Sequence, residues 1–311
     1  MDRPPSRRAV LASLAGAGAA ASIGLRAAPD SAAAPGPKLV RAIPASGEQI
    51  PAIGLGTWIT FNVGENAKLR DERAKVLRAF FERGGAMVDS SPMYGSSEAV
   101  IGHGLARVAG RRALFSATKV WTLWEGAGRR QIQESRRLWG LQRFDLIQVH
   151  NLLRWESHLE TLRAEQAAGR IRYIGVTTSH GRRHDELEEI MARQSIDFVQ
   201  FTYNVVDREV ERRLLTLAAE RRLAVIVNRP FQEGTLIDRL AGKKLPAWAA
   251  EIDCANWAQF LLKFIVSHPA VTCAIPATSR VDHLEENMGA LNGRLPDAKL
   301  RARMIRYVEA L

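Results

Sequence analysis

The chain has 311 residues, of which 46% are hydrophobic, so it is long enough to bury a sizeable core. Its formal net charge is +11, but basic residues are interleaved with acids, as in residues 208–222, and no stretch alternates basic with aromatic residues. We therefore expect an arginine-rich helix exterior and no nucleic-acid partner. The two cysteines, Cys254 and Cys273, lie outside any thioredoxin-type or zinc motif, so we expect buried thiols and no metal site.

The first 37 residues differ from the rest. Paired arginines, Arg7 and Arg8, precede a weakly hydrophobic run that ends near Leu25 and is followed by small residues and prolines. This pattern is similar to a twin-arginine export signal, and the apolar run is too short for a convincing membrane span. We expect a periplasmic or exported protein that folds in the cytoplasm first and meets the twin-arginine translocase during export. A disordered alanine-rich leader is the alternative interpretation.

From residue 38 onward, short apolar runs alternate with amphipathic segments. A hairpin is expected over residues 38–50, and a first strand within residues 50–58. Further apolar runs predict strands at residues 86–90, 113–120, 144–150, 171–177, 197–204, 223–228 and 271–276. Between them, apolar residues at three- and four-residue spacing predict helices over residues 70–85, 97–110, 129–141, 157–170 and 208–222, and a further helix is expected after the last strand.

Strands without polar alternation are typical of a parallel sheet that is covered on both faces. Eight strand–helix repeats in this length predict an α/β fold of the (β/α)8 TIM-barrel type rather than an open sheet. We expect the N-terminal hairpin to plug the bottom of the barrel. No linker composition interrupts residues 38–311, which are taken as one domain after the leader, residues 1–37. The long segment after the seventh strand, residues 233–259, is expected to hold a loop over the barrel mouth.

Polar residues end three consecutive predicted strands. Asp89 ends the second strand with Tyr94 just beyond it, Lys119 ends the third, and His150 ends the fourth. In a barrel of this kind the active site lies at the carboxyl ends of the strands, so these four side chains should meet. A tyrosine has a reference pKa of about 10 and needs a nearby positive charge to give up a proton, which Lys119 could supply with Asp89 as its counter-ion. His150 could orient a carbonyl oxygen by a hydrogen bond.

The motifs GLGTW, VDSSPMYG, ATKV, LIQVHN, GRIRYIGVT and IPATSRVDHLEEN resemble the aldo-keto reductases in order and spacing. The resemblance runs from about residue 38 to the C-terminus, and the four side chains above fall on the positions of the family's tetrad. It implies hydride transfer from a nicotinamide cofactor to an aldehyde or ketone, with Tyr94 as the general acid. It implies NADPH in preference to NADH, since no GxGxxG follows a strand and no acid is placed to bind a ribose hydroxyl.

The resemblance also implies where the cofactor would bind. Gln200 matches a glutamine that contacts the carboxamide, and Asn228 stands where the family commonly has an aromatic residue that stacks on the nicotinamide. The helix after the eighth strand offers free N–H groups to phosphate, and Ser279 and Arg280 are expected at the 2′-phosphate of NADPH. The full set of expected cofactor residues is Gly56, Thr57, Thr177, Thr178, Gln200, Asn228, Arg229, Pro230, Ser279, Arg280, His283, Glu286 and Asn287.

Apolar side chains after the strands indicate the substrate. Trp58, Met93, Trp121 and Trp124 are expected at the mouth and favour a flat or apolar small-molecule carbonyl compound. A second hypothesis is a redox sensor or a cofactor-carrying protein that has the same barrel and binds the nucleotide but shows little turnover. A hydrolase or isomerase is disfavoured because the sequence shows neither a metal-ligand cluster nor a carboxylate pair.

Overall fold

The computed structural model describes residues 38–124 and 126–311, so the leader predicted over residues 1–37 lies outside the described part. Two short strands, β1 (Val40–Ala42) and β2 (Gln49–Pro51), pair antiparallel as a hairpin. Eight further strands form one sheet: β3 (Leu55–Gly56), β4 (Met87–Asp89), β5 (Phe115–Val120), β6 (Phe144–Val149), β7 (Ile171–Thr177), β8 (Phe198–Thr202), β9 (Ala224–Asn228) and β10 (Val271–Ala274). Each of these eight pairs with its neighbours in parallel, in chain order, which agrees with the expected α/β architecture.

The sheet curls until its two edges meet. Parallel bridges join Ile53 to Ala274 and Gly56 to Ala277. The backbone N–H of Gly54 donates to the carbonyl of Ala274 at 2.8 Å. A Cβ at Gly56 would lie only 2.7 Å from the carbonyl oxygen of Ile275, so a glycine is needed where the first and last strands approach each other.

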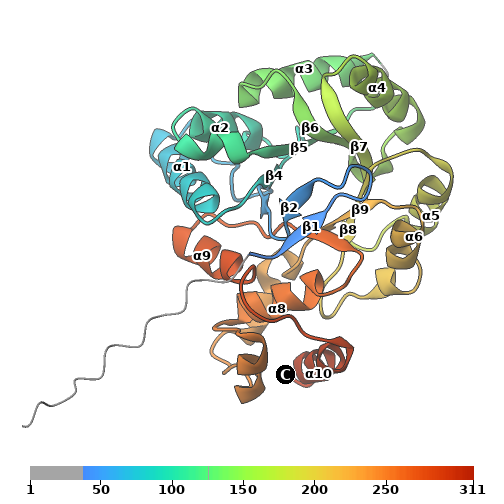
Figure 1. Ribbon diagram of the computed structural model, residues 1–311. Coiled ribbons are helices and arrows are strands. Elements are labelled where there is room, and N and C mark those ends of the chain that lie inside the picture. The colour runs from blue at the N-terminus through green and yellow to red at the C-terminus, as the bar shows by residue number, and fades with distance from the viewer. Residues whose placement is uncertain (1–37, 125) are drawn as a thin grey trace, which may run out of the picture. The chain divides into compact units, whose positions relative to one another are not determined.

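Helices lie on the outside of the strands (Figure 1). They are α1 (Ala67–Glu82), α2 (Ser97–Leu105), α3 (Ala127–Trp139), α4 (Trp155–Ala167), α5 (His184–Arg193), α6 (Leu214–Glu220), α7 (Thr235–Leu240), α8 (Trp257–Val266), α9 (Val281–Gly289) and α10 (Ala298–Glu309). Local signals fix several ends: the Asn66 side chain accepts the N–H of Leu69 at the start of α1, and Gly140 in the left-handed region ends α3. Over the described residues, no helix combines the length and apolar character needed to cross a membrane.

Two buried clusters account for the core. The larger one lies between the strands and the surrounding helices, and the smaller one is built from alternate strand residues that face the inside of the sheet. The smaller cluster contains Met87, Phe115, Ala117, Leu146, Tyr173, Phe198, Ala224, Ile226, Cys273 and Ile275 together with Ile43 and Ile50 of the hairpin segment. Cys273 is therefore buried as expected, whereas Cys254 is only half-buried.

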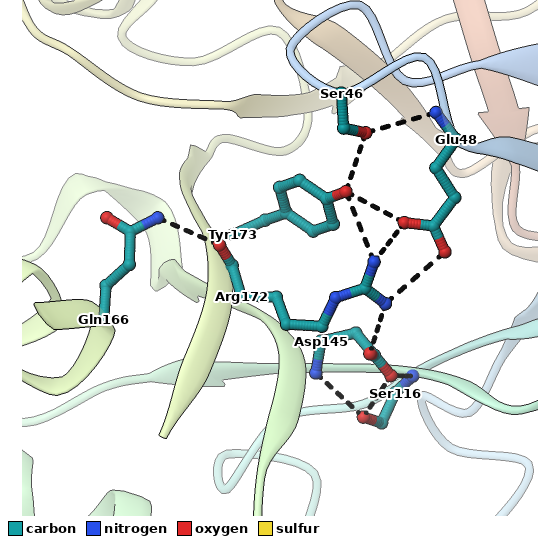
Figure 2. Close-up of polar contacts among 7 residues, drawn as sticks. All are labelled: Ser46, Glu48, Ser116, Asp145, Gln166, Arg172 and Tyr173. Carbon is teal, nitrogen blue, oxygen red and sulfur yellow. Dashed lines mark hydrogen bonds and ion pairs between the residues drawn. The ribbon is translucent and has the colours of Figure 1, made fainter. Parts of the chain in front are cut away.

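A polar cluster connects the hairpin to the amino-terminal ends of three strands (Figure 2). The Arg172 guanidinium forms ion pairs with Glu48 of the hairpin segment and with Asp145 of β6, the latter at 2.8 Å. The Tyr173 hydroxyl donates to Glu48 at 2.8 Å, and Asp145 accepts the hydroxyl of Ser116 at 2.8 Å. The hairpin is thus held to β5, β6 and β7, while its role as a plug stays a prediction.

The segment after β9 differs from the expected loop. Residues 233–259 contain α7 and a short 3-10 helix, Ala247–Ile252, before α8 begins. Ala249 and Ile252 are buried in the larger core cluster, because apolar residues in this segment pack against neighbouring helices. Only Glu233 and Gly234, at its start, contribute to the cleft described below.

Candidate active site

The inward-facing residues change from apolar to polar toward the carboxyl ends of the strands. Side chains alternate across a strand, so residues two apart face the same side. Phe115 and Ala117 belong to the interior cluster, and the next inward residue of β5 is Lys119; Leu146 of β6 is likewise followed by Gln148. The four predicted side chains, Asp89, Tyr94, Lys119 and His150, lie together on this polar layer.

Asp89 and Lys119 form a fully buried ion pair. The Lys119 ammonium lies 2.6 Å from Asp89 Oδ2 and 2.8 Å from the carbonyl oxygen of Ser90, and it is 0% exposed. Burial by itself lowers the pKa of Lys119, but the Asp89 carboxylate and the Tyr94 phenol raise it, so the net shift is upward. Lys119 therefore stays protonated and presents a fixed positive charge at the end of β5.

The Tyr94 phenol lies beside this charge. The Lys119 ammonium is 5.2 Å from the centroid of the Tyr94 ring, and the Tyr94 and His150 rings meet edge to face at 5.6 Å. Burial raises the pKa of Tyr94, and the positive charge of Lys119 opposes that rise only in part. The charge of Lys119 acts in the expected direction, toward the phenolate, but burial outweighs it in the protein alone. Tyr94 therefore stays fully protonated at neutral pH, which keeps a proton ready to donate.

His150 is held in its neutral form. Burial, and then the positive charge of Lys119, lower the pKa of His150 well below its ordinary value of 6.5. Its Nδ1 lies 2.9 Å from the hydroxyl of Ser91, and the side chain lines the cleft. A neutral imidazole beside a protonated phenol can contact the same oxygen atom of a ligand.

The sequence reasoning missed two buried residues of this layer. Gln148 donates its amide to Asp89 Oδ1 at 3.4 Å, and Ser91 contacts His150 as described above. Gln148 could have been found from its position two residues before His150 on one strand, which places both on the same face. Ser91 lies inside the quoted motif, but nothing in its spacing singles it out.

A cleft with a volume of about 430 Å³ opens over the polar layer. Its size falls in the range of small-molecule sites. Asp89, Tyr94 and His150 line it from one side; Lys119 lies beneath them, out of contact with the cleft. The expected residues that line it further are Gly56, Thr57, Trp58, Met93, Thr177, Gln200, Asn228, Arg229 and Pro230.

Gln200 and Asn228 are joined in one hydrogen-bond network. Gln200 donates its amide to Asp89 Oδ1 at 3.2 Å, and its carbonyl accepts from Asn228 at 3.4 Å. Asn228 also donates to the carbonyl of Thr178 at 2.9 Å and accepts from the hydroxyl of Thr202 at 2.8 Å. Asn228 is therefore a fixed, planar amide. Thr178 takes part through its backbone and does not line the cleft.

Arg229 brings positive charge to the lining of the cleft. Its Nη2 lies 3.4 Å from Glu233, whereas its buried Nε has no hydrogen-bond partner among the described residues. Arg229 has a φ of 50°, in the left-handed region that non-glycine residues rarely adopt. A strained residue that carries an unpaired donor at a cleft is suited to an anionic ligand.

Five expected cofactor residues lie outside this cleft, in and before α9. Arg280 forms an ion pair with Asp282, with its Nε 3.0 Å from Oδ1, and Asp282 also accepts the N–H of His283. The Ser279 carbonyl accepts from Arg73 at 3.4 Å. His283 and Glu286 are exposed, and Asn287 is buried. Arg280 is thus already paired, which the sequence reasoning did not foresee.

The expected substrate residues divide into two groups. Trp58 and Met93 line the cleft and remain 37% and 42% exposed, next to Ile59, which the sequence reasoning missed. Trp121 and Trp124 are exposed but do not line the cleft. Ile59 has a φ of 61°, a strained conformation for a β-branched residue. Part of the lining of the cleft is therefore apolar, while Arg229 and Glu233 add charged groups to it.

Comparisons with known proteins identify the family of the chain. The chain is 28% identical over 260 residues to methylglyoxal reductase YeaE of Escherichia coli, covering 81% of this chain and 89% of that protein. It is 23% identical over 307 residues to an NADH-specific methylglyoxal reductase of the same organism, covering 79% and 91%. Its fold matches the crystal structure of an aldo/keto reductase from Klebsiella pneumoniae in complex with NADP and acetate, with a TM-score of 0.72, 27% identity and coverage of 84% and 93%. Residues 52–302 match the Aldo/keto reductase family, so the chain belongs to the aldo/keto reductase family.

Proposed function

We propose that the protein is an NADPH-dependent oxidoreductase that reduces an aldehyde or ketone to an alcohol. The observation that carries this proposal is the arrangement of Tyr94 and His150 at one cleft, above the buried pair of Asp89 and Lys119. Membership of the aldo/keto reductase family supports it, as do the relatives named for methylglyoxal reduction and the related structure that contains NADP.

Tyr94 is the general acid in this proposal. Its raised pKa keeps the phenol protonated until negative charge develops on a carbonyl oxygen next to it. At that point the phenol can donate its proton, because the fixed charge of Lys119 stabilises the phenolate that remains. Asp89 holds Lys119 in place through the 2.6 Å contact, so it acts on the acid indirectly.

The residues present fit a nicotinamide nucleotide. Arg229 lines the cleft, and its buried Nε has no hydrogen-bond partner among the described residues, so its guanidinium is suited to a phosphate oxygen; Gln200 and Asn228 line the same cleft as Tyr94. A bound NADPH would supply the hydride. The side chains before and in α9 (Ser279, Arg280, His283, Glu286 and Asn287) are assigned to the adenosine end by the family resemblance alone.

The substrate is proposed to be a small carbonyl compound with an apolar portion. Trp58, Ile59 and Met93 offer partly exposed apolar surface on the rim beside Tyr94. Covering such surface is favourable by about 25 cal/mol per Å². Trp121 and Trp124 would contact only a substrate that extends beyond the cleft.

Four further proposals concern the leader, the domain, its location and the hairpin. We propose that residues 1–37 are a twin-arginine signal, which the translocase would recognise, that residues 38–311 form the exported domain and that the mature protein is periplasmic or exported. We also propose that the β1–β2 hairpin closes the amino-terminal end of the barrel, supported by Ile43 and Ile50 in the interior cluster. A reporter fused after residue 37 and expressed with and without a functional twin-arginine translocase tests the export proposal.

Titration and turnover together test the enzymatic proposal. The domain of residues 38–311 is titrated with NADPH and NADH by fluorescence, and NADPH oxidation is followed with a panel of aldehydes, ketones and quinones. Tyr94→Phe should bind NADPH as before and lose most turnover. The control variant Tyr307→Phe, which removes a phenol hydroxyl from α10, should keep both NADPH binding and turnover. Binding without turnover on any carbonyl compound would favour the redox sensor or cofactor carrier, and equal turnover in both variants would remove Tyr94 as the acid.

A further inference from the structure

Ser91 is a fully buried residue in direct contact with His150. It lies two residues after Asp89, and its hydroxyl oxygen is 2.9 Å from Nδ1 of the imidazole. The same oxygen accepts the backbone N–H of Met93 at 3.2 Å. A buried hydroxyl that accepts one hydrogen bond still has one proton to donate, and leaving that proton without an acceptor is unfavourable.

Counting protons assigns the tautomer of His150. Among the described residues, the acceptor in reach of the Ser91 hydroxyl is His150 Nδ1. If Nδ1 carried the imidazole proton, two donors would face each other or the Ser91 proton would have no acceptor. With the hydroxyl donating to Nδ1, the neutral ring carries its proton on Nε2.

Two further observations agree with this assignment. Burial and the charge of Lys119 favour the neutral imidazole, so only one ring nitrogen carries a proton. No described residue forms a hydrogen bond with Nε2, while the His150 side chain lines the cleft. An N–H group on Nε2 is therefore free to donate to a ligand in the cleft.

We propose that Ser91 is a positioning residue that fixes His150 as the Nε2–H tautomer, so that the imidazole donates a hydrogen bond to the carbonyl oxygen of the substrate. The use of that hydrogen bond rests on the proposed reductase function, but the tautomer itself does not. Ser91 thus acts on the substrate through His150.

The neighbouring serine provides a matched control. Ser90 is as buried as Ser91, but its hydroxyl has no hydrogen-bond partner among the described residues. Ser91→Ala and Ser90→Ala therefore remove the same atom from adjacent positions, and only the first is expected to change His150.

The test is nitrogen NMR of the protein labelled at its histidines, without nucleotide or substrate. The chain has 7 histidines, and the His150 signals are assigned by their loss in His150→Gln. The unsubstituted protein and Ser90→Ala should show a protonated Nε2 and an unprotonated Nδ1. Ser91→Ala should show a mixture of tautomers or the Nδ1–H form. A protonated Nδ1 in the unsubstituted protein would overturn the inference by itself. An unchanged tautomer in Ser91→Ala would also overturn it.

Kinetics then test the use of the tautomer. In Ser91→Ala, kcat for carbonyl reduction should fall about tenfold, with NADPH affinity unchanged, because one hydrogen bond to the reacting oxygen is weakened. A shifted tautomer with an unchanged kcat would overturn the role in positioning. If the unsubstituted protein shows the Nε2–H form but reduces no carbonyl compound, the proposed function fails and the tautomer assignment stands.

Discussion

Breaking the buried pair of Asp89 and Lys119 should destabilise the protein far more than breaking an exposed pair at the same distance. In Lys119→Met, the Asp89 carboxylate would remain 1% exposed and keep only the amide contacts of Gln148 and Gln200, at 3.4 and 3.2 Å. Removing one partner of a buried ion pair costs about 3–5 kcal/mol. For a domain of this size, that corresponds to a fall in the unfolding midpoint of roughly 10 °C.

The structure offers a control for this prediction. Arg137 and Glu134 on α3 are also 2.6 Å apart, but their side chains are 69% and 51% exposed. Because solvent screens such a pair, Arg137→Met should change the free energy of unfolding by less than about 1 kcal/mol.

A double-mutant cycle separates the pair from its surroundings. Thermal unfolding followed by circular dichroism would compare Lys119→Met, Asp89→Asn and the double variant. Each single variant leaves one buried charge without its partner, whereas the double variant removes both charges. The double variant should therefore lose clearly less free energy of unfolding than the two single variants added together. Additive losses, or a Lys119→Met protein as stable as Arg137→Met, would refute the view that burial makes this pair costly to break.

Three further outcomes are expected. The kcat/KM for reduction should be level from about pH 7 to pH 9, because His150 is already neutral in this range. It should fall only as pH rises through the raised pKa of Tyr94. A step near pH 6.5 in the pH–rate profile would contradict the lowered pKa of His150. Asp282→Asn should tighten NADPH binding several-fold in fluorescence titrations and leave NADH binding unchanged, because it removes a negative charge from the start of α9 and releases Arg280; an equal change for both nucleotides would speak against a phosphate there. Glu48→Gln should lower the free energy of unfolding in urea by about 1 kcal/mol without changing kcat, because the ion pair is partly exposed and lies at the opposite end of the strands; an unchanged stability would argue against the hairpin contact.

The proton-handling side of the cleft was predictable because strand geometry leaves little freedom there. Asp89 and Lys119 sit at the ends of strands whose alternation and order can be read from apolar runs, so their meeting follows from a parallel sheet. The same reasoning would have found Gln148. It could not give Ser91 its role, which depends on how the chain turns after β4 to bring a hydroxyl to His150.

The expected cofactor and substrate residues in loops were less predictable, because their long side chains have several possible partners. Arg280 was assigned to a nucleotide phosphate, but an acid two residues along the chain competes for it, and both groups are about 60% exposed. Trp121 and Trp124 were assigned to the mouth, but the loop after β5 holds them outside the cleft. The order of the strands determines where residues at strand ends lie. The positions of loops and long side chains depend on contacts that sequence spacing does not reveal.

The direction of the pKa shift of Tyr94 could not be predicted from the sequence either. The residue types correctly indicate that Lys119 stabilises a phenolate, but the net direction depends on burial, which the sequence does not measure. Burial outweighs the charge in the protein alone, so the phenol is a weaker acid than in water until a ligand brings developing negative charge to its proton. The lysine charge is then already in place, fixed by Asp89 and unable to reorganise, and its stabilisation of the phenolate acts when the proton moves.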